Sequence, residues 1–196
     1  RNGPGEPLDF VEQAVISGLA YDRDGKAQSC MGIALDDADA DGLLDMHVTN
    51  FYKESNTLYV QQSAGIFRDR TRQARLREPG FNLLGFGTQF LDAQLDGQPD
   101  LVVANGHVDD YTYQGSPFQM RPQFLCNVGG IYLDQGETAG DYFGRKLLGR
   151  GEAGEGGEGG CEGDARGRRQ RQVVVAGDGR QGDRDAAEDD DGRDEA

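Results

Sequence analysis

The stretch CMGIALDD at residues 30–37 has a second copy, GFGTQFLD at residues 85–92, which follows 55 positions later without a gap. In each copy a short, mostly apolar run leads into an acidic turn, and a second apolar run follows the turn. A further shared element comes later, as GIFRD at 65–69 and GIYLD at 130–134, so the second copy carries about ten extra residues. Repeats of this length are typical of propellers or solenoids, in which each unit buries its apolar face on its neighbours.

Each unit is expected to form four short antiparallel strands. Val-rich and aromatic runs bounded by Gly-containing or acidic turns favour strands. The predicted strands are 32–35, 44–49, 57–61 and 66–68 in the first unit, and 88–91, 101–104, 123–127 and 131–133 in the second. Four strands per unit is what a propeller blade requires. The sequence therefore predicts an all-β fold of propeller-type blades, with a short helix or turn at 11–20.

The chain divides near residue 150. We expect a repeat region at 1–150, made of a partial repeat at 1–29, a repeat at about 30–84 and a repeat at about 85–148; Phe10-Val11-Glu12 resembles the end of the truncated first copy. Residues 151–196 are dominated by Gly, Asp, Glu and Arg and contain no aromatic residue, Leu or Ile. Only Val173-Val174-Val175 offers core material there, which is too little to offset the entropy of ordering. Two interpretations stay open: a disordered acidic tail, or a coding region read out of frame.

Charge and composition exclude several classes of partner. The chain has 196 residues and a formal net charge of −15, so it lacks the basic surface that nucleic acid binding needs. No apolar run approaches the roughly 18 residues of a membrane helix, so no membrane insertion is expected. No signal peptide is visible, and Arg1 in place of Met suggests a processed or truncated start. Cys30, Cys126 and Cys161 are too scattered for a disulfide framework; a Cys30–Cys126 bridge is possible, but free buried thiols are favoured.

The first acidic turn, DADADGLLD at 37–45, has the pattern of a cation site. Carboxylates at alternate positions of a tight loop converge on one point, and two of them about 4 Å apart repel by about 4 kcal/mol at an effective dielectric of 20. The turn therefore either holds a hard cation or is splayed and solvated; all-oxygen ligation favours Ca²⁺ over Mg²⁺. An EF-hand is rejected because position 12 is Val48 instead of Glu. The predicted ligands are the side chains of Asp37, Asp39, Asp41 and Asp45 and the carbonyl of Leu43.

The second turn, at 92–100, is a weaker version of the same pattern. Gln94 replaces an aspartate, and Pro99 precedes the last acid. Because Gln still offers a neutral carbonyl oxygen, we expect calcium to bind here with lower affinity. The predicted ligands are Asp92, Gln94, Asp96, Gln98 and Asp100.

These residues resemble the FG-GAP (VCBS) repeat family. Gly85-Phe86-Gly87-Thr88 and Met31-Gly32 each lead into an acidic turn, and Val48-Thr49-Asn50 and Val103-Ala104-Asn105 look most like the secreted ASPIC/UnbV and cartilage acidic protein branch. The resemblance spans about residues 10–150. It implies a β-propeller like that of integrin α subunits, calcium at the blade loops, and an extracellular or periplasmic location. A third acidic turn would be expected after residue 151 but is absent, so the chain resembles a fragment whose partners include the remaining blades.

The sequence favours a binding or adhesion scaffold over an enzyme. No nucleophile elbow, zinc motif or phosphate loop is present. His47 is expected to pack within a strand, and His107 to fix a loop through hydrogen bonds. Tyr111, Tyr113 and Phe118 are candidates for an exposed contact surface, although packing against the blade is an equal alternative. The predicted function is a calcium-binding scaffold for an unknown protein or glycan ligand; the alternative is the non-catalytic propeller portion of a secreted polysaccharide-active enzyme.

Overall fold

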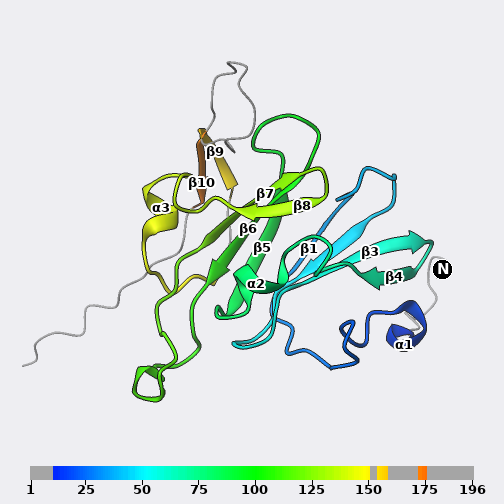
Figure 1. Cartoon of the computed structure of the whole chain (residues 1–196), viewed down its shortest axis with the longest axis horizontal. Helices are drawn as coiled ribbons and strands as arrows, with labels where there is room; N and C mark the ends of the chain where they lie inside the picture. Colours follow the sequence, from blue (N-terminus) through cyan, green and yellow to red (C-terminus); the bar gives the residue numbers. More distant parts are fainter. Residues whose placement is uncertain (1–10, 151–153, 159–171, 176–196) are drawn as a thin grey trace, which may run out of the picture.

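The computed structural model describes residues 11–150 in full, together with the backbone of two short strands at 154–158 and 172–175. Residues 11–150 contain two antiparallel four-stranded sheets, each with its strands in sequence order (Figure 1). The first sheet consists of β1 (Ile33–Asp36), β2 (Asp45–Val48), β3 (Thr57–Ser63) and β4 (Ile66–Asp69). The second consists of β5 (Gly85–Leu91), β6 (Asp100–Asn105), β7 (Gln123–Val128) and β8 (Ile131–Asp134). The prediction of an all-β fold is confirmed, and every predicted strand forms within three residues of its expected bounds.

The helices are single turns between or beside the strands. They are α1 (Ala14–Ser17), α2 (Arg77–Gly80), α3 (Asp141–Gly144) and the 3₁₀ turn η1 (Thr112–Gln114). The α1 turn is the short helix predicted within residues 11–20, and it lies beside β4. The approach is close because Gly18 has no side chain: a Cβ there would overlap the carbonyl oxygen of Phe67.

The main core lies between the two sheets. Buried apolar side chains from both sheets form one cluster; they are Ala34, Ala38, Leu58, Val60, Ala74, Leu76, Phe90, Leu101, Val103, Leu125 and Tyr132. A second cluster covers the far face of the second sheet, where Val102, Phe124 and Cys126 pack against Ala139 and Phe143. The second sheet is therefore covered on both faces, the far face by the segment that carries α3.

The first sheet is covered fully on only one face. Ala34 and Leu58 face the second sheet, whereas Ile33 and Leu35 on the other face are 60% and 55% exposed. The repeat aligns Leu35 with Phe90, which is only 7% exposed because the first sheet packs over it. The two sheets thus stack in the same orientation. The exposed face of the first sheet is equivalent to the face of the second sheet that the first sheet covers.

The sheets meet most closely at their first strands, β1 and β5. Thr49 accepts a hydrogen bond from Gly32 N–H at 2.8 Å and donates its hydroxyl to the carbonyl of Phe86 at 2.6 Å. Gly32 has to be glycine here, because a Cβ would overlap the Phe86 carbonyl oxygen. Gly32, which the repeat aligns with Gly87, therefore serves the contact between the two sheets.

The repeat pattern continues at the end of the described segment. Gly149 N–H donates to Asn105 O at 3.0 Å, as Gly85 N–H donates to Asn50 O at 3.2 Å. The chain at Gly149 thus leaves the second sheet as it left the first. Two backbone strands follow, β9 (Gly154–Glu158) and β10 (Gln172–Val175), and they pair with each other. Most of 151–196 and residues 1–10, Phe10 included, lie outside the described residues, so the tail and partial-repeat predictions stay predictions.

Two findings correct the expectation for the cysteines. Cys30 is a free thiol, so it does not pair with Cys126, and it is exposed instead of buried. It lies shortly before β1. Cys126 is buried as expected but is disulfide-bonded, so the prediction of a free thiol is wrong there. No helix among the described residues is long and apolar enough to cross a bilayer.

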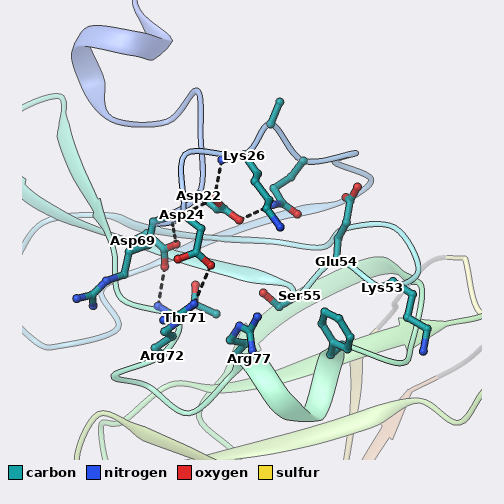
Figure 2. A pocket seen from close by; sticks show the side chains of 14 residues that line it. Asp22, Asp24, Lys26, Lys53, Glu54, Ser55, Asp69, Thr71, Arg72 and Arg77 are labelled. Carbon is teal, nitrogen blue, oxygen red and sulfur yellow. Dashed lines mark hydrogen bonds and ion pairs between the residues drawn. The ribbon is translucent and has the colours of Figure 1, made fainter.

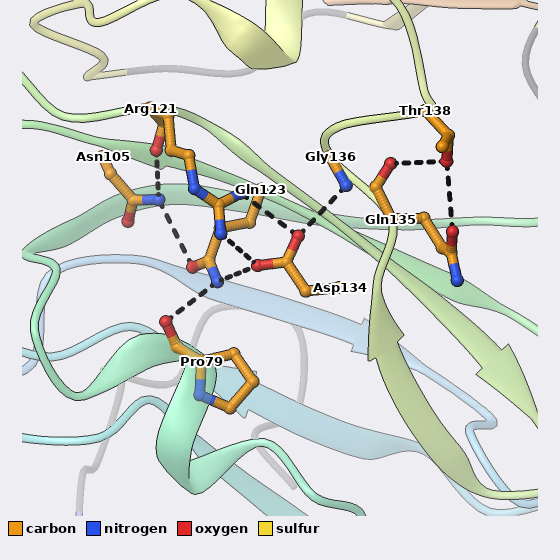
Figure 3. A network of polar contacts seen from close by, with 8 residues as sticks. All are labelled: Pro79, Asn105, Arg121, Gln123, Asp134, Gln135, Gly136 and Thr138. Carbon is orange, nitrogen blue, oxygen red and sulfur yellow. Dashed lines mark hydrogen bonds and ion pairs between the residues drawn. The ribbon is translucent and has the colours of Figure 1, made fainter.

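A polar network holds the second sheet to the segments around it (Figure 3). Arg121 forms two hydrogen bonds with the carboxylate of Asp134, at 2.7 and 3.2 Å. Gln123 donates to the same carboxylate and to the carbonyl of Pro79, both at 3.1 Å. Burial alone would raise the pKa of Asp134, but these donors and Gly136 N–H bring its pKa below the usual value. The charged carboxylate is therefore the form that the fold stabilises.

We expect Asp134→Asn to lower the free energy of unfolding at pH 7 by about 1–3 kcal/mol, because Arg121 loses its partly buried partner. A lowered pKa stabilises the fold above the unfolded-state value, near 3.9, and this stabilisation is lost as the pH falls. The difference from wild type should therefore shrink between pH 5 and pH 3 in urea unfolding. Glu78→Gln, at an exposed acid with no side-chain hydrogen bond, is the control. Equal effects of the two variants would contradict the role of the network.

Candidate metal centre

The two acidic turns have the same backbone conformation. Each connects the first two strands of its sheet, β1 to β2 and β5 to β6. Ala40 and Leu95 lie at equivalent positions with φ of 61° and 58°, and Gly42 and Gly97 follow with φ of 85° and 83°. Left-handed values are unfavourable for residues other than glycine, so their recurrence at both sites is a specific feature of the turn.

The first acid of each turn organises the loop. Asp37 accepts N–H hydrogen bonds from Asp41 at 3.0 Å and from Gly42 at 2.8 Å. Asp92 accepts the matching two bonds 55 residues later, at the same distances. The first carboxylate therefore fixes the turn through the backbone, whichever residues fill the variable positions.

The last acid of each turn ties the turn to the third strand of its sheet. Asp45 is fully buried and accepts N–H bonds from Ala38 in the turn at 2.9 Å and from Gln61 in β3 at 2.8 Å. Asp100 makes the matching pair of bonds, with the turn at 3.2 Å and with Asn127 in β7 at 2.8 Å. Burial raises the pKa of Asp45 and raises that of Asp100 to about 6, because the charged carboxylates lose water.

Three acids of the first turn gather around one point. One carboxylate oxygen from each of Asp37, Asp39 and Asp45 lies within 4.8 Å of the others. Asp41 is not in this group; its carboxylate accepts a hydrogen bond from Leu43 N–H at 2.8 Å. Partial burial, together with the charges of Asp41 and Asp37, raises the pKa of Asp39. Oxygen ligands from carboxylates in this arrangement are suited to a hard cation.

The second turn brings fewer acids together. Among the described residues, Asp92, Asp96 and Asp100 do not form a three-acid group of this kind. Gln94 replaces Asp39; its amide nitrogen donates to Cys126 Sγ at 2.9 Å, and its buried Oε1 has no hydrogen-bond partner. Gln98, at the position of Leu43, uses its own Oε1 to accept from Gly129 N–H at 2.7 Å. The second turn thus offers fewer carboxylates than the first, with the unpartnered Gln94 oxygen as a neutral donor at the position of Asp39.

Sequence reasoning missed the residues of the third strand that complete each turn. Gln61 and Asn127 bind the closing carboxylates through their backbone N–H groups. Residue type carries no signal for such a contact. The strand pairing is needed to find it. Met46 lies opposite Tyr59, and Leu101, its equivalent in the repeat, lies opposite Leu125. Gln61 and Asn127 each lie two residues further along the third strand, so they are equivalent.

The histidines occupy structural positions, as predicted. His47 is fully buried between the sheets, with Nδ1 2.8 Å from the Thr88 hydroxyl, and burial lowers its pKa to about 3. His107 accepts a long hydrogen bond, 3.5 Å, from Asp109 N–H within its loop. Its ring also packs edge-on against Phe51 and Tyr111. Both rings are therefore held by packing.

The predicted aromatic contact residues differ in exposure. Tyr113, at the tip of the β6–β7 loop, is 77% exposed. Tyr111 is half-buried against His107, and Phe118 is half-buried with its carbonyl bound to His107 N–H. The loop thus presents one largely exposed tyrosine, while Tyr111 packs against His107 and Phe118 is half-buried.

No known protein family matches this chain, and no curated protein matches it.

The strained backbone at position 95 gives a test of the turn. Leu95 is 62% exposed at φ 58°, a conformation that costs a non-glycine residue roughly 1–2 kcal/mol. We expect Leu95→Gly to raise the free energy of unfolding by about 0.5–1 kcal/mol. This is the strain relieved in the folded state, less the cost of the extra conformational entropy that glycine gives the unfolded chain. Leu44→Gly is the matched control, because Leu44 is 57% exposed and does not have a positive φ. Thermal unfolding should show opposite shifts; destabilisation by both changes would contradict the conformation described.

Proposed function

We propose that this chain is a calcium-binding, extracellular β-propeller repeat scaffold that binds a protein or glycan ligand in adhesion. The observation that carries the proposal is the recurrence of one acidic turn, with the same strained backbone and the same carboxylate hydrogen bonds, in both sheets. Two copies that keep left-handed residues and buried acids are better explained by a shared ligand than by solvated loops.

Calcium fits the first turn better than other common cations. Its group of Asp37, Asp39 and Asp45 offers only oxygen ligands, and calcium accepts six to eight oxygens in flexible geometry. Mg²⁺ demands a near-octahedral shell and keeps several waters. Burial, and then the charges of Asp41 and Asp37, raise the pKa of Asp39, and a cation would offset both effects. In this proposal Leu43 O and Asp41 complete the shell, and the second turn binds more weakly through Asp92, Gln94, Asp96, Gln98 and Asp100.

The stacking of the sheets supports the propeller part of the proposal. Both sheets present the same face in the same direction, and their first strands lie next to each other. Repetition of this relation would place another blade on the exposed face with Ile33 and Leu35. The resemblance to FG-GAP repeats supports the same architecture and the secreted location. Further blades of the same kind are thus the first expected partner.

Calcium binding is tested by thermal unfolding of the whole chain with CaCl₂, with MgCl₂ and with a chelator. Binding to the native state alone should stabilise it by about 2.7 kcal/mol at a calcium concentration 100 times the dissociation constant. We expect a rise with calcium that magnesium does not reproduce. Equal stability in all three buffers would show that the turns are only solvated.

The sign of the Asp39→Asn effect separates a ligand role from a structural role. The raised pKa of Asp39 means that the fold disfavours its charge. Removing that charge should therefore stabilise the protein in chelator, and should destabilise it relative to wild type in saturating calcium. Unfolding midpoints of both proteins in both buffers provide the measurement, with Glu78→Gln as the control. A change of the same sign in both buffers would argue against Asp39 as a calcium ligand.

A further inference from the structure

We propose that the pocket between the 22–28 segment, the end of β4 and α2 binds an acidic sugar, with Arg77 holding its carboxylate (Figure 2). The proposal rests on the proposed function in one respect, because it takes the chain to be a glycan-binding scaffold. It does not require calcium in the acidic turns. The pocket has a volume of about 250 Å³, which is sufficient for one sugar unit.

The carboxylates around the pocket are already occupied by the protein. Asp22 accepts from Asp24 N–H, Lys26 N–H and the amide of Gln28, at 2.6 to 2.9 Å. Asp24 forms an ion pair with Arg72 at 2.7 Å. Asp69 accepts from Arg23 and Thr71 N–H groups, both at 2.8 Å, and Glu54 accepts from Ser29 N–H at 2.7 Å. The pocket's negative charge is therefore largely satisfied internally.

The guanidinium of Arg77 has no such partner. Among the described residues no carboxylate lies within ion-pair distance of Arg77, whose guanidinium lies 5.6 Å from the ring centroid of Phe81. Figure 2 shows it pointing toward Ser55. The lining contains five cationic and four acidic side chains, in a protein whose net charge is −15. This local excess of positive charge, in which Arg77 has no carboxylate partner, favours an anionic ligand.

The second sheet shows what a filled version of this pocket looks like. Strand pairing and matching bonds from Asn50 and Asn105 make Ser55 equivalent to Arg121. The same register makes Asp69 equivalent to Asp134. In the second sheet the guanidinium of Arg121 occupies the space beside that carboxylate (Figure 3). In the first sheet the short side chain of Ser55 leaves that space open.

A hydroxyl-bearing acid suits the remaining polar groups better than a simple carboxylate. Gln28 lines the pocket, and its buried Oε1 has no hydrogen-bond partner, so it requires a donor. The Ser55 hydroxyl also lines the pocket and donates no hydrogen bond within the described residues. A sugar acid supplies both O–H donors and acceptors, together with the carboxylate for Arg77.

The test is a titration of the whole isotope-labelled chain with glucuronate, followed by the NMR signals of the Arg77 side chain and the Ser55 and Thr71 amides. Glucose, acetate and a sulfated glucose are titrated in parallel. We expect saturable shifts with glucuronate and none with glucose; acetate should bind at least tenfold more weakly. Saturation by glucose or equal binding of acetate would overturn the proposal, and tighter binding of the sulfated sugar would replace the carboxylate by sulfate as the recognised group.

Three variants test whether glucuronate binds in this pocket. Arg77→Met should weaken glucuronate binding by about tenfold or more, through loss of a charge-assisted hydrogen bond. Ser55→Arg should abolish binding by filling the pocket as Arg121 does. Arg145→Met removes one exposed charge outside the pocket and should leave binding unchanged. If Arg77→Met and Arg145→Met, both folded by their amide spectra, bind alike, the proposal is wrong.

Each glucuronate titration is run both in calcium and in chelator, so that the sugar proposal and the calcium proposal are tested separately. Failure to bind glucuronate in a chain that calcium stabilises would overturn only the sugar site. Glucuronate binding in a chain that calcium does not stabilise would overturn only the calcium assignment.

Discussion

Both sheets depend on a buried carboxylate that joins an acidic turn to the third strand. Asp45 and Asp100 are fully buried, and desolvating a charged carboxylate without partners is costly. Each is compensated by one N–H from its turn and one from the third strand, at Gln61 or Asn127. The turn therefore cannot move without breaking a contact in the sheet. A cation bound at the turn would stabilise the sheet through the same carboxylate.

The stacking of the sheets follows from the repeat, but the burial of equivalent residues does not. Leu35 and Phe90 occupy one repeat position, yet the first is 55% exposed and the second 7%. The difference arises from what lies beside each sheet and not from the residue itself. Glycine marks the contact more directly: Gly32 and Gly85 both lie against Thr49, where a side chain would overlap neighbouring atoms. Close approach of the backbones at these glycines therefore fixes the spacing of the sheets, and apolar side chains fill the space between them.

The strands and turns could be predicted from the sequence because their causes are local. Alternating apolar residues, Gly-containing turns such as Gly129-Gly130, and the acidic ladder from Asp37 all act within a few positions. The features that could not be predicted depend on distant contacts. Phe90 is buried because the first sheet packs over it, and Asp45 is held by Gln61 N–H in the third strand. Asp41 is an exception, because the contact that keeps its carboxylate out of the acid cluster, with Leu43 N–H, is local. The resemblance to FG-GAP repeats also rests on short sequence motifs, and it remains a hypothesis.

One repeat position shows how the two sheets diverged. Arg121 places a guanidinium on Asp134, and Gly136 leaves room for it, since a Cβ there would lie 2.8 Å from Arg121 Nη1. In the first sheet Ser55 is too short to reach Asp69, so backbone N–H groups of the 22–28 segment and of Thr71 satisfy that carboxylate instead. Both solutions supply a partly buried carboxylate with hydrogen-bond donors, because leaving it without partners would be costly. Only the arrangement of the first sheet leaves an open volume beside Arg77, whose guanidinium has no carboxylate partner among the described residues. The pocket is thus a consequence of replacing a side-chain partner by backbone donors.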